Sequence, residues 1–256
     1  DEYVMAGQGT IGLEILEDLP AVETVVVPIG GGGLISGIAT AMKAYDSDIR
    51  VVGVQAEGAS SVAKSLEKGA VQQLDSVDTI ADGIATRAVG EKTFPIIEER
   101  VDEVVTVTDD EIAYAVTLLL ERGKTLVEGA GAVPLAALLE ERFEYTDGEV
   151  VVPVLSGGNI DMNLLTTVIM RGLVDQGRYL KIRTVLEDRP GSLRQVLDVI
   201  AEERANIYAI QHDRTSRDIA MSDTEVEIDL ETRGEEHVEG LLARLRGEGF
   251  DVDVLV

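Results

Sequence analysis

Residues 24–43 read TVVVPIGGGGLISGIATAMK and decide the fold of the chain. Residues 24–27 form a short apolar, β-branched run, which is typical of a buried strand. Residues 34–43 place apolar side chains at roughly helical spacing. The two segments are separated by four consecutive glycines, Gly30, Gly31, Gly32 and Gly33. The stretch therefore predicts a strand, a glycine loop and a helix.

The glycine loop has the properties of a phosphate-binding site. Residues without a Cβ let the backbone approach a ligand closely and point successive N–H groups toward it. The following helix adds unpaired N–H groups and the positive end of its dipole. A tight turn without a ligand is the alternative, but four glycines carry an entropic cost that a plain turn does not require. We therefore expect the loop to bind a phosphate.

A dinucleotide is one phosphate ligand that the spacing allows. Residues 31–36 nearly match the pattern GxGxxG/A, with Ser36 as the last small residue. Glu57 closes the next predicted strand, residues 51–57, roughly where dinucleotide-binding folds place the acid that binds the ribose. A nicotinamide site is therefore an alternative, although the other motifs of the chain do not belong to a dehydrogenase.

The composition excludes several classes of protein. The chain has 256 residues, enough for one large domain or two modest ones, and 45% of them are hydrophobic, which supports a packed core. No apolar run approaches the roughly 18 residues of a membrane span. The absence of cysteine excludes disulfides, thiolate metal sites and cysteine nucleophiles. We expect a cytoplasmic protein without a membrane partner.

The charge of the chain is strongly negative. Asp and Glu number 48 against 22 Lys and Arg, which gives a net charge of −26 at pH 7. Such a field repels nucleic acids and anionic membranes, so neither is expected as a partner. An acidic, lysine-poor surface resembles that of proteins from salt-loving organisms, where cations screen the self-repulsion. We therefore expect a halophilic protein whose fold loosens when salt is removed.

Strands and helices alternate through the first 175 residues. A helix over residues 11–19 is expected to begin after the segment 7–10. Further on, the sequence predicts a strand over 104–107, a helix over 112–122 that begins with a capping box of Thr108 and Glu111, a glycine-rich start to an alanine-rich helix at 127–138, and a strand over 150–155. This alternation predicts an α/β fold with a mostly parallel sheet.

A second glycine motif, Ser156-Gly157-Gly158-Asn159, follows the strand over 150–155. The carboxyl ends of parallel strands meet at one edge of the sheet, where ligands bind. The loops at 30–33 and 156–159 are therefore expected to face one site.

The order of predicted strands and helices changes after the polar residues 175–177. This change divides the chain into domains 1–175 and 176–256. The second domain is predicted to contain a strand, a helix, two strands, a helix and a strand, over residues 179–186, 193–203, 206–212, 225–230, 235–247 and 251–256. This order is the ferredoxin-like arrangement βαββαβ.

The motifs carry a resemblance to a known family. The glycines 30–33, Glu128-Gly129-Ala130-Gly131-Ala132 and the motif at 156–159, in this order, resemble the pyridoxal-phosphate enzymes of the threonine and serine dehydratase group. Residues 188–193 and 211–214 look like the marks of an ACT domain. The resemblance implies the second half of a fold-type II (tryptophan-synthase β-like) catalytic domain, followed by a regulatory ACT domain.

The resemblance also implies roles for particular residues. The cofactor would be pyridoxal 5'-phosphate, with its phosphate held by the backbone N–H groups of residues 30–33. Ser156 would offer its hydroxyl to the pyridine nitrogen, and Glu128 would lie near the ring; the alternative for Glu128 is an ordinary buried, hydrogen-bonded carboxylate. Glu57 matches a residue that binds a structural cation in relatives, but their second acidic ligand is not matched here.

One departure from the family concerns its lysine. The family attaches the cofactor as a Schiff base to a lysine in a Ser-Phe-Lys-x-Arg-Gly-Ala type motif, and none of the six lysines of this chain has that neighbourhood. No residue of the chain is therefore assigned as catalytic. We expect the sequence to be a fragment that begins within the catalytic domain and is inactive by itself.

The ACT resemblance implies an effector site and pairing of copies. The turn Arg189, Pro190, Gly191, Ser192 and Leu193 is expected to bind an amino acid, with a branched-chain amino acid as the hypothesis, and paired ACT domains imply a homo-oligomer. His212 and His237 lack metal-ligand spacing and are expected to be structural or surface residues.

The resemblance implies the activity of a threonine ammonia-lyase, which converts L-threonine to 2-oxobutyrate and ammonia and belongs to isoleucine biosynthesis. A serine dehydratase or serine racemase of the same group is the near alternative. A non-catalytic protein that senses amino acids through its ACT domain is the alternative from another class.

Overall fold

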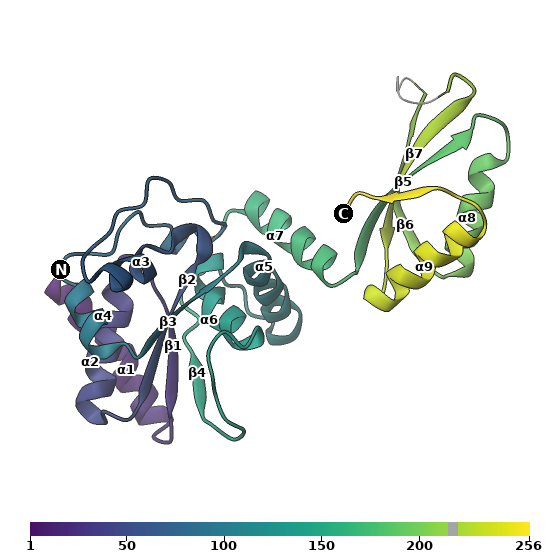
Figure 1. The fold of residues 1–256 in the computed structure, drawn as a ribbon. Helices are drawn as coiled ribbons and strands as arrows, with labels where there is room; N and C mark the ends of the chain where they lie inside the picture. Colours follow the sequence, from purple (N-terminus) through teal and green to yellow (C-terminus); the bar gives the residue numbers. More distant parts are fainter. Residues whose placement is uncertain (215–219) are drawn as a thin grey trace. The chain divides into compact units, whose positions relative to one another are not determined.

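The computed structural model describes residues 1–214 and 220–256 (Figure 1). They form two compact units, Asp1–Ile169 and Met170–Val256. The division falls inside helix α7 (Met162–Asp175), whereas the sequence places the domain boundary at residue 175, the end of that helix. Among the described residues, no helix has both the length and the apolar character needed to cross a membrane.

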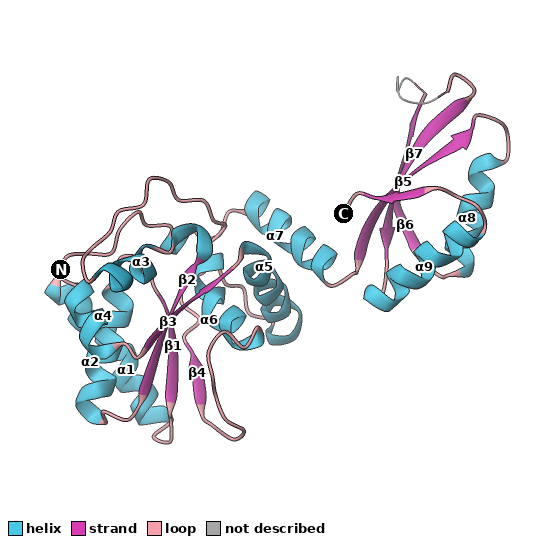
Figure 2. Ribbon diagram, in the orientation of Figure 1, coloured by secondary structure: helices cyan, strands magenta, loops and turns pink. Residues whose placement is uncertain are grey.

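The first unit is built on a parallel sheet (Figure 2). Its strands, in spatial order β3-β2-β1-β4, are β3 (Glu103–Val107), β2 (Arg50–Ala56), β1 (Thr24–Pro28) and β4 (Val151–Pro153). Each neighbouring pair runs parallel, so the carboxyl ends of all of these strands lie at the same edge. The predicted α/β class is confirmed.

Helices cover both faces of this sheet. They are α1 (Glu2–Asp18), α2 (Gly33–Tyr45), α3 (Ser61–Lys68), α4 (Phe94–Arg100), α5 (Asp109–Leu118) and α6 (Gly129–Leu139), with short 3-10 turns η1 (Glu57–Ala59) and η2 (Asp82–Ile84). Side chains of β1 alternate between two cores: Val25 and Val27 belong to the core that contains α2, and Val26 belongs to the core that contains α5 and α6. This double burial explains why β1 reads as an unbroken apolar run.

The structure corrects the predicted start of the first helix. α1 begins at Glu2, after Asp1 accepts a hydrogen bond from the backbone N–H of Tyr3 at 2.8 Å, and not after residue 10. Gly9 and Gly12 lie inside the helix and face α2: a Cβ on Gly9 would come within 3.0 Å of the Gly37 carbonyl oxygen. The glycines allow α1 and α2 to pack closely. Local sequence does not reveal this packing, so from sequence alone the glycine-rich segment is interpreted as the start of the helix.

Three further elements differ from the prediction. The capping box of α5 is present, with Thr108 N–H donating to Glu111 Oε2 at 2.8 Å, but the helix passes at residue 119 into a π-helical turn, η3 (Leu119–Gly123). β4 is shorter than the predicted strand and ends at Pro153. Helix α7 was not expected; its start is marked by Asp161, whose Oδ1 accepts from Asn163 N–H at 2.8 Å.

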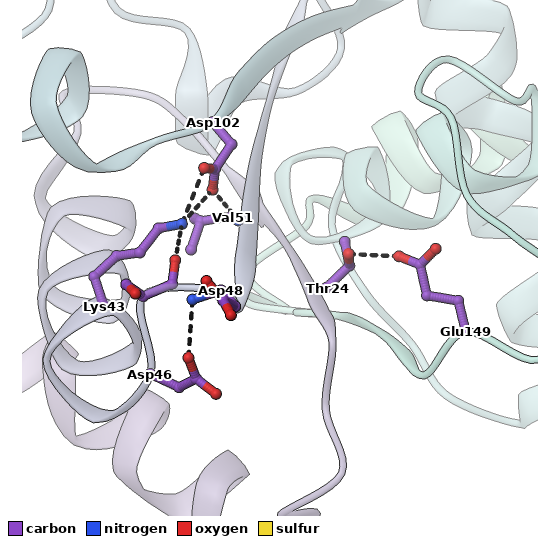
Figure 3. A network of polar contacts seen from close by, with 8 residues as sticks. Thr24, Lys43, Asp46, Asp48, Val51, Asp102 and Glu149 are labelled. Atoms are coloured by element: carbon purple, nitrogen blue, oxygen red, sulfur yellow. Dashed lines mark hydrogen bonds and ion pairs between the residues drawn. The ribbon is translucent and has the colours of Figure 1, made fainter.

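A polar network ties the amino ends of the strands together, at the edge opposite the glycine loops (Figure 3). Thr24 donates its hydroxyl proton to Glu149 at 2.6 Å. Asp102 accepts from Val51 N–H at 2.7 Å and pairs with Lys43 at 2.8 Å. These contacts stabilise the starts of the strands, at the amino edge of the sheet. The carboxyl edge carries the glycine loops.

The second unit has the predicted ferredoxin-like order. Its elements are β5 (Tyr179–Glu187), α8 (Ser192–Glu202), β6 (Asn206–Asp213), β7 (Asp223–Glu231), α9 (Glu235–Gly247) and β8 (Val252–Val254). The strands form an antiparallel sheet in the order β6-β7-β5-β8. Ile182, Ile228 and Leu241 are fully buried in the core between this sheet and its helices.

Candidate functional site

The glycine loop leaves β1 at the carboxyl edge of the sheet. Ile29 N–H donates to the Val54 carbonyl oxygen at 2.8 Å and holds the start of the loop against β2. Gly32 adopts the left-handed conformation (φ 88°) and caps α2 without a side-chain hydrogen bond. Only glycine takes this conformation without strain, so this position of the loop requires its residue type.

The four glycines alternate between packed and open positions. A Cβ on Gly30 would come within 3.0 Å of Ile84, and one on Gly32 within 2.8 Å of the Thr93 hydroxyl oxygen. A Cβ on Gly31 would meet nothing within 4 Å, and one on Gly33 only Val4 at 4.0 Å. The loop is therefore fixed on one side and borders open space on the other.

The N–H groups of this loop have no hydrogen-bond partner among the residues that the structure describes. None of the backbone N–H groups of Gly30, Gly31, Gly32 and Gly33 donates a hydrogen bond within residues 1–214 and 220–256. Unpaired N–H donors that precede a helix suit a phosphate, because they offer hydrogen bonds and partial positive charge without a cationic side chain. The loop fits the phosphate group that the sequence predicts.

The second glycine motif lies at the same edge. β4 is the parallel neighbour of β1, with Thr24 opposite Val151, and Val154 N–H donates to the Val26 carbonyl oxygen at 2.9 Å. Ser156 follows two residues later and is half-buried. Its hydroxyl makes no hydrogen bond with any part of the chain that the structure describes, so it is available to a ligand.

Glu128 joins the second motif to the rest of the site. Its N–H donates to the Gly157 carbonyl oxygen at 3.2 Å, and its own carbonyl oxygen accepts from Gly131 N–H at 2.9 Å as α6 begins. Its carboxylate lies between two glycines of different segments. A Cβ on Gly83 would come within 3.2 Å of Glu128 Oε1, and a Cβ on Gly157 would overlap it.

The carboxyl group of Glu128 has unusual surroundings. Burial is the first cause that raises the pKa of Glu128 above its ordinary value, and the negative charge of Asp82 is the second. No described residue donates a hydrogen bond to this carboxylate. The role of Glu128 at the ring stays a prediction. A carboxyl group that keeps its proton more readily can donate a hydrogen bond to an anionic ligand.

Contacts run without a break from the first glycine loop to the second: Gly30 adjoins Ile84 of η2, Gly83 of η2 adjoins Glu128, and Glu128 adjoins Gly157. Neither η2 nor Thr93 is among the residues that the sequence predicts for the site. The alternating small residues at 81–85 are a weak sequence signal for η2. The sequence carries no signal that the Gly90–Thr93 turn belongs to the site.

Glu57 lies apart from this group of residues. It is exposed at the start of η1, just after β2. The described residues contain no cluster of three or more acidic or histidine side chains able to hold a metal ion. The cation stays a prediction.

The predicted effector residues lie together in the second unit. Arg189, Pro190 and Gly191 lie in the turn between β5 and α8, and Ser192 and Leu193 begin α8. All five line a hollow of about 320 Å³. Gly191 is left-handed (φ 101°). Arg214 borders the hollow. Its Nε donates to Asp188 Oδ2 at 2.8 Å, and its Nη2 donates to Asp188 Oδ1 at 3.1 Å. Effector binding there stays a prediction.

Comparisons with known proteins agree with this geometry. The chain is 53% identical over 255 residues to the L-threonine ammonia-lyase of Geobacter sulfurreducens and 44% identical to that of Thermotoga maritima. All of this chain is matched, and it spans 63% of the length of each relative.

Solved structures show the same relationship. The threonine deaminase of T.th. has a TM-score of 0.60 at 43% identity, over 63% of this chain and 59% of that one. The serine racemase of Dictyostelium discoideum has a TM-score of 0.57 at 42% identity, over 62% of this chain and 50% of that one.

Family profiles identify both parts of the chain. The profile described as "Pyridoxal-phosphate dependent enzyme" matches residues 1–157, and the ACT domain profile matches residues 177–248. The predicted cofactor is confirmed as that of the family, and the nicotinamide alternative is set aside. The chain belongs to the pyridoxal-phosphate dependent enzymes and carries an ACT domain after its catalytic part.

Proposed function

We propose that this chain takes part in the pyridoxal-phosphate-dependent deamination of L-threonine to 2-oxobutyrate and ammonia. The observation that carries the proposal is the unbroken set of contacts that joins Gly30, Gly83, Glu128 and Gly157 at one sheet edge. It stands beside 53% identity to an L-threonine ammonia-lyase over the whole chain. Bound cofactor would draw electrons from the substrate and so ease loss of the α-proton and the β-hydroxyl.

The backbone of residues 30–33 would hold the cofactor phosphate. Its N–H groups have no partner in the described part of the chain, and the positive end of the α2 dipole lies behind them. Binding through backbone groups suits this chain, because it needs no lysine or arginine in a protein with a net charge of −26.

Ser156 and Glu128 would act at the ring. The hydroxyl of Ser156 would bind the ring nitrogen without transferring a full charge to it, which moderates the electron-withdrawing power of the ring and suits elimination. The raised pKa of Glu128 favours the protonated form of its carboxyl group more than in an ordinary glutamate, which suits a position beside an anionic cofactor. Gly83 and Gly157, which flank that carboxyl group, would keep it in place.

A lysine for covalent attachment is not found among these residues. Lys43 pairs with Asp102 at the opposite sheet edge, Lys92 pairs with Glu2, and Lys181 pairs with Glu227 in the second unit. The six lysines all lie in the described ranges, and none of them has a hydrogen bond or ion pair with the site residues there. We infer that the 256-residue chain alone is inactive and that the reaction needs a lysine from outside it.

The ACT unit would bind an amino acid and control the reaction, as expected for isoleucine biosynthesis in a homo-oligomer. The support is the hollow that contains the turn 189–193. Calorimetric titration with isoleucine and valine tests it: binding that Gly191→Val abolishes supports the site, and unchanged binding to that variant contradicts it.

The activity is tested by 2-oxobutyrate and ammonia release from L-threonine, with L-serine for comparison. The natural gene product that contains residues 1–256 is expected to release both products, and the isolated 256-residue chain is expected to release neither. Release by the isolated chain would contradict the requirement for an outside lysine. Interconversion of serine enantiomers without product release would favour the racemase alternative, and amino-acid binding without any cofactor uptake would favour the sensor.

A further inference from the structure

We infer that Thr93 is a positioning residue for the phosphate site: its hydroxyl holds the Gly31 carbonyl so that the N–H of Gly32 faces the ligand. The inference rests on the proposed function, because it concerns the loop that would hold the cofactor phosphate. Thr93 lies 62 residues after Gly31 in the sequence and touches the side of the loop that is turned away from open space.

The Gly31 carbonyl oxygen accepts two hydrogen bonds from one short turn. Thr93 Oγ1 lies 2.7 Å from it, and Gly90 N–H donates to it at 3.2 Å. Thr93 Oγ1 also lies 3.0 Å from the Gly90 carbonyl oxygen. The hydroxyl has a single proton, and the shorter distance makes Gly31 its principal acceptor.

This arrangement fixes the direction of the next N–H group. The described peptide bonds are all trans, and in a trans peptide the N–H points opposite to the preceding carbonyl. With the Gly31 carbonyl directed at the turn, the Gly32 N–H is directed away from it. That N–H has no partner in the described residues, so it can donate a hydrogen bond to a ligand.

Thr93 is itself held firmly. The residue is 6% exposed, its N–H donates to the Gly90 carbonyl oxygen at 3.1 Å, and its own carbonyl oxygen accepts from Ile97 N–H at 3.0 Å as α4 begins. Gly32 packs closely against this side chain, since a Cβ at that position would come within 2.8 Å of Thr93 Oγ1. The turn and the loop are thus packed before any ligand arrives, which lowers the cost of ordering the donors.

The test is a titration of the ¹⁵N-labelled 256-residue chain with inorganic phosphate at constant ionic strength, followed through the amide signals of residues 30–33. Thr93→Val keeps the shape of the side chain and removes the hydroxyl. Its phosphate affinity is expected to fall about fivefold, the effect of one lost hydrogen bond, with a reduced shift of the Gly32 amide signal. Thr93→Ser keeps the hydroxyl and is expected to retain the affinity of the unaltered chain.

The outcomes separate the two proposals. Signals of residues 30–33 that do not respond to phosphate in the unaltered chain would contradict the phosphate site and, with it, the role of Thr93. A normal response in the unaltered chain together with unchanged affinity in Thr93→Val would overturn the role of Thr93 alone. If Thr93→Val does not fold, Thr93→Ser and Thr93→Ala, which differ only in the hydroxyl oxygen, give the same comparison: equal affinities contradict the inference.

Discussion

The backbone N–H of Glu128 donates to the carbonyl oxygen of Gly157 at 3.2 Å, which joins the amino end of α6 to the loop after β4. The same pair meets a second time, because a Cβ on Gly157 would overlap the Glu128 carboxylate. Gly157 therefore supplies both a hydrogen-bond acceptor and the space that the carboxyl group occupies.

Gly157→Ala is expected to destabilise the first unit by about 1–3 kcal/mol, because alanine is strained at φ 91° and its methyl group displaces Glu128. Urea unfolding followed by circular dichroism measures the effect. Gly158→Ala is the matched control, since its Cβ would come no closer than 3.6 Å to another residue. Equal stability of the two variants would contradict the steric argument.

Glu128→Gln is expected to stabilise the chain at pH 7.5. The folded-state pKa of Glu128 is raised by burial and by Asp82, so the protonated form favours the folded chain. That contribution is fully present below the unfolded pKa of about 4.3 and is lost as pH rises through the higher folded pKa. The gain of the glutamine variant should therefore vanish near pH 4.

Urea unfolding of this variant between pH 4 and pH 8 gives the comparison. Glu98→Gln makes the same chemical change at an exposed position of α4 and is expected to show no such pH-dependent gain. A gain for Glu128→Gln that does not change with pH would contradict the raised pKa.

Thr24→Val tests the network at the opposite edge of the sheet. The Thr24 hydroxyl is the first cause that lowers the pKa of Glu149, and Thr146 N–H is the second. A lowered pKa contributes stability above the unfolded pKa, and that stability is lost as pH falls through the folded value. We expect the variant to lose about 1 kcal/mol at pH 7 and progressively less under acid conditions. A loss that persists undiminished in acid would indicate packing as its cause.

Salt is expected to stabilise the chain strongly. The net charge of −26 makes like charges repel one another across the folded surface. At molar concentration, salt screens this repulsion beyond a few ångströms. The melting temperature should rise between 0.05 and 2 M KCl. A melting temperature that is the same at both concentrations would contradict the halophilic prediction.

Local sequence was sufficient for the features that depend on neighbouring residues. The glycines 30–33, the capping box at Thr108 and the βαββαβ order of the second unit all follow from spacing along the chain. The shared edge of the two glycine loops also followed, because parallel strands bring their carboxyl ends together.

Features that depend on distant contacts could not be predicted. Gly9 has the same local appearance at a helix start as inside a helix, and only the approach of Gly37 decides between them. The same holds for Thr93, whose acceptor is 62 residues away, and for Gly83, which matters because Glu128 lies beside it.

The most direct test of the account is a titration of the ¹⁵N-labelled chain with pyridoxine 5'-phosphate, which lacks the aldehyde and so does not react with lysines. We predict amide shifts at residues 30–33, Glu128 and Ser156. Saturable binding without any shift at these residues would contradict the proposed cofactor site.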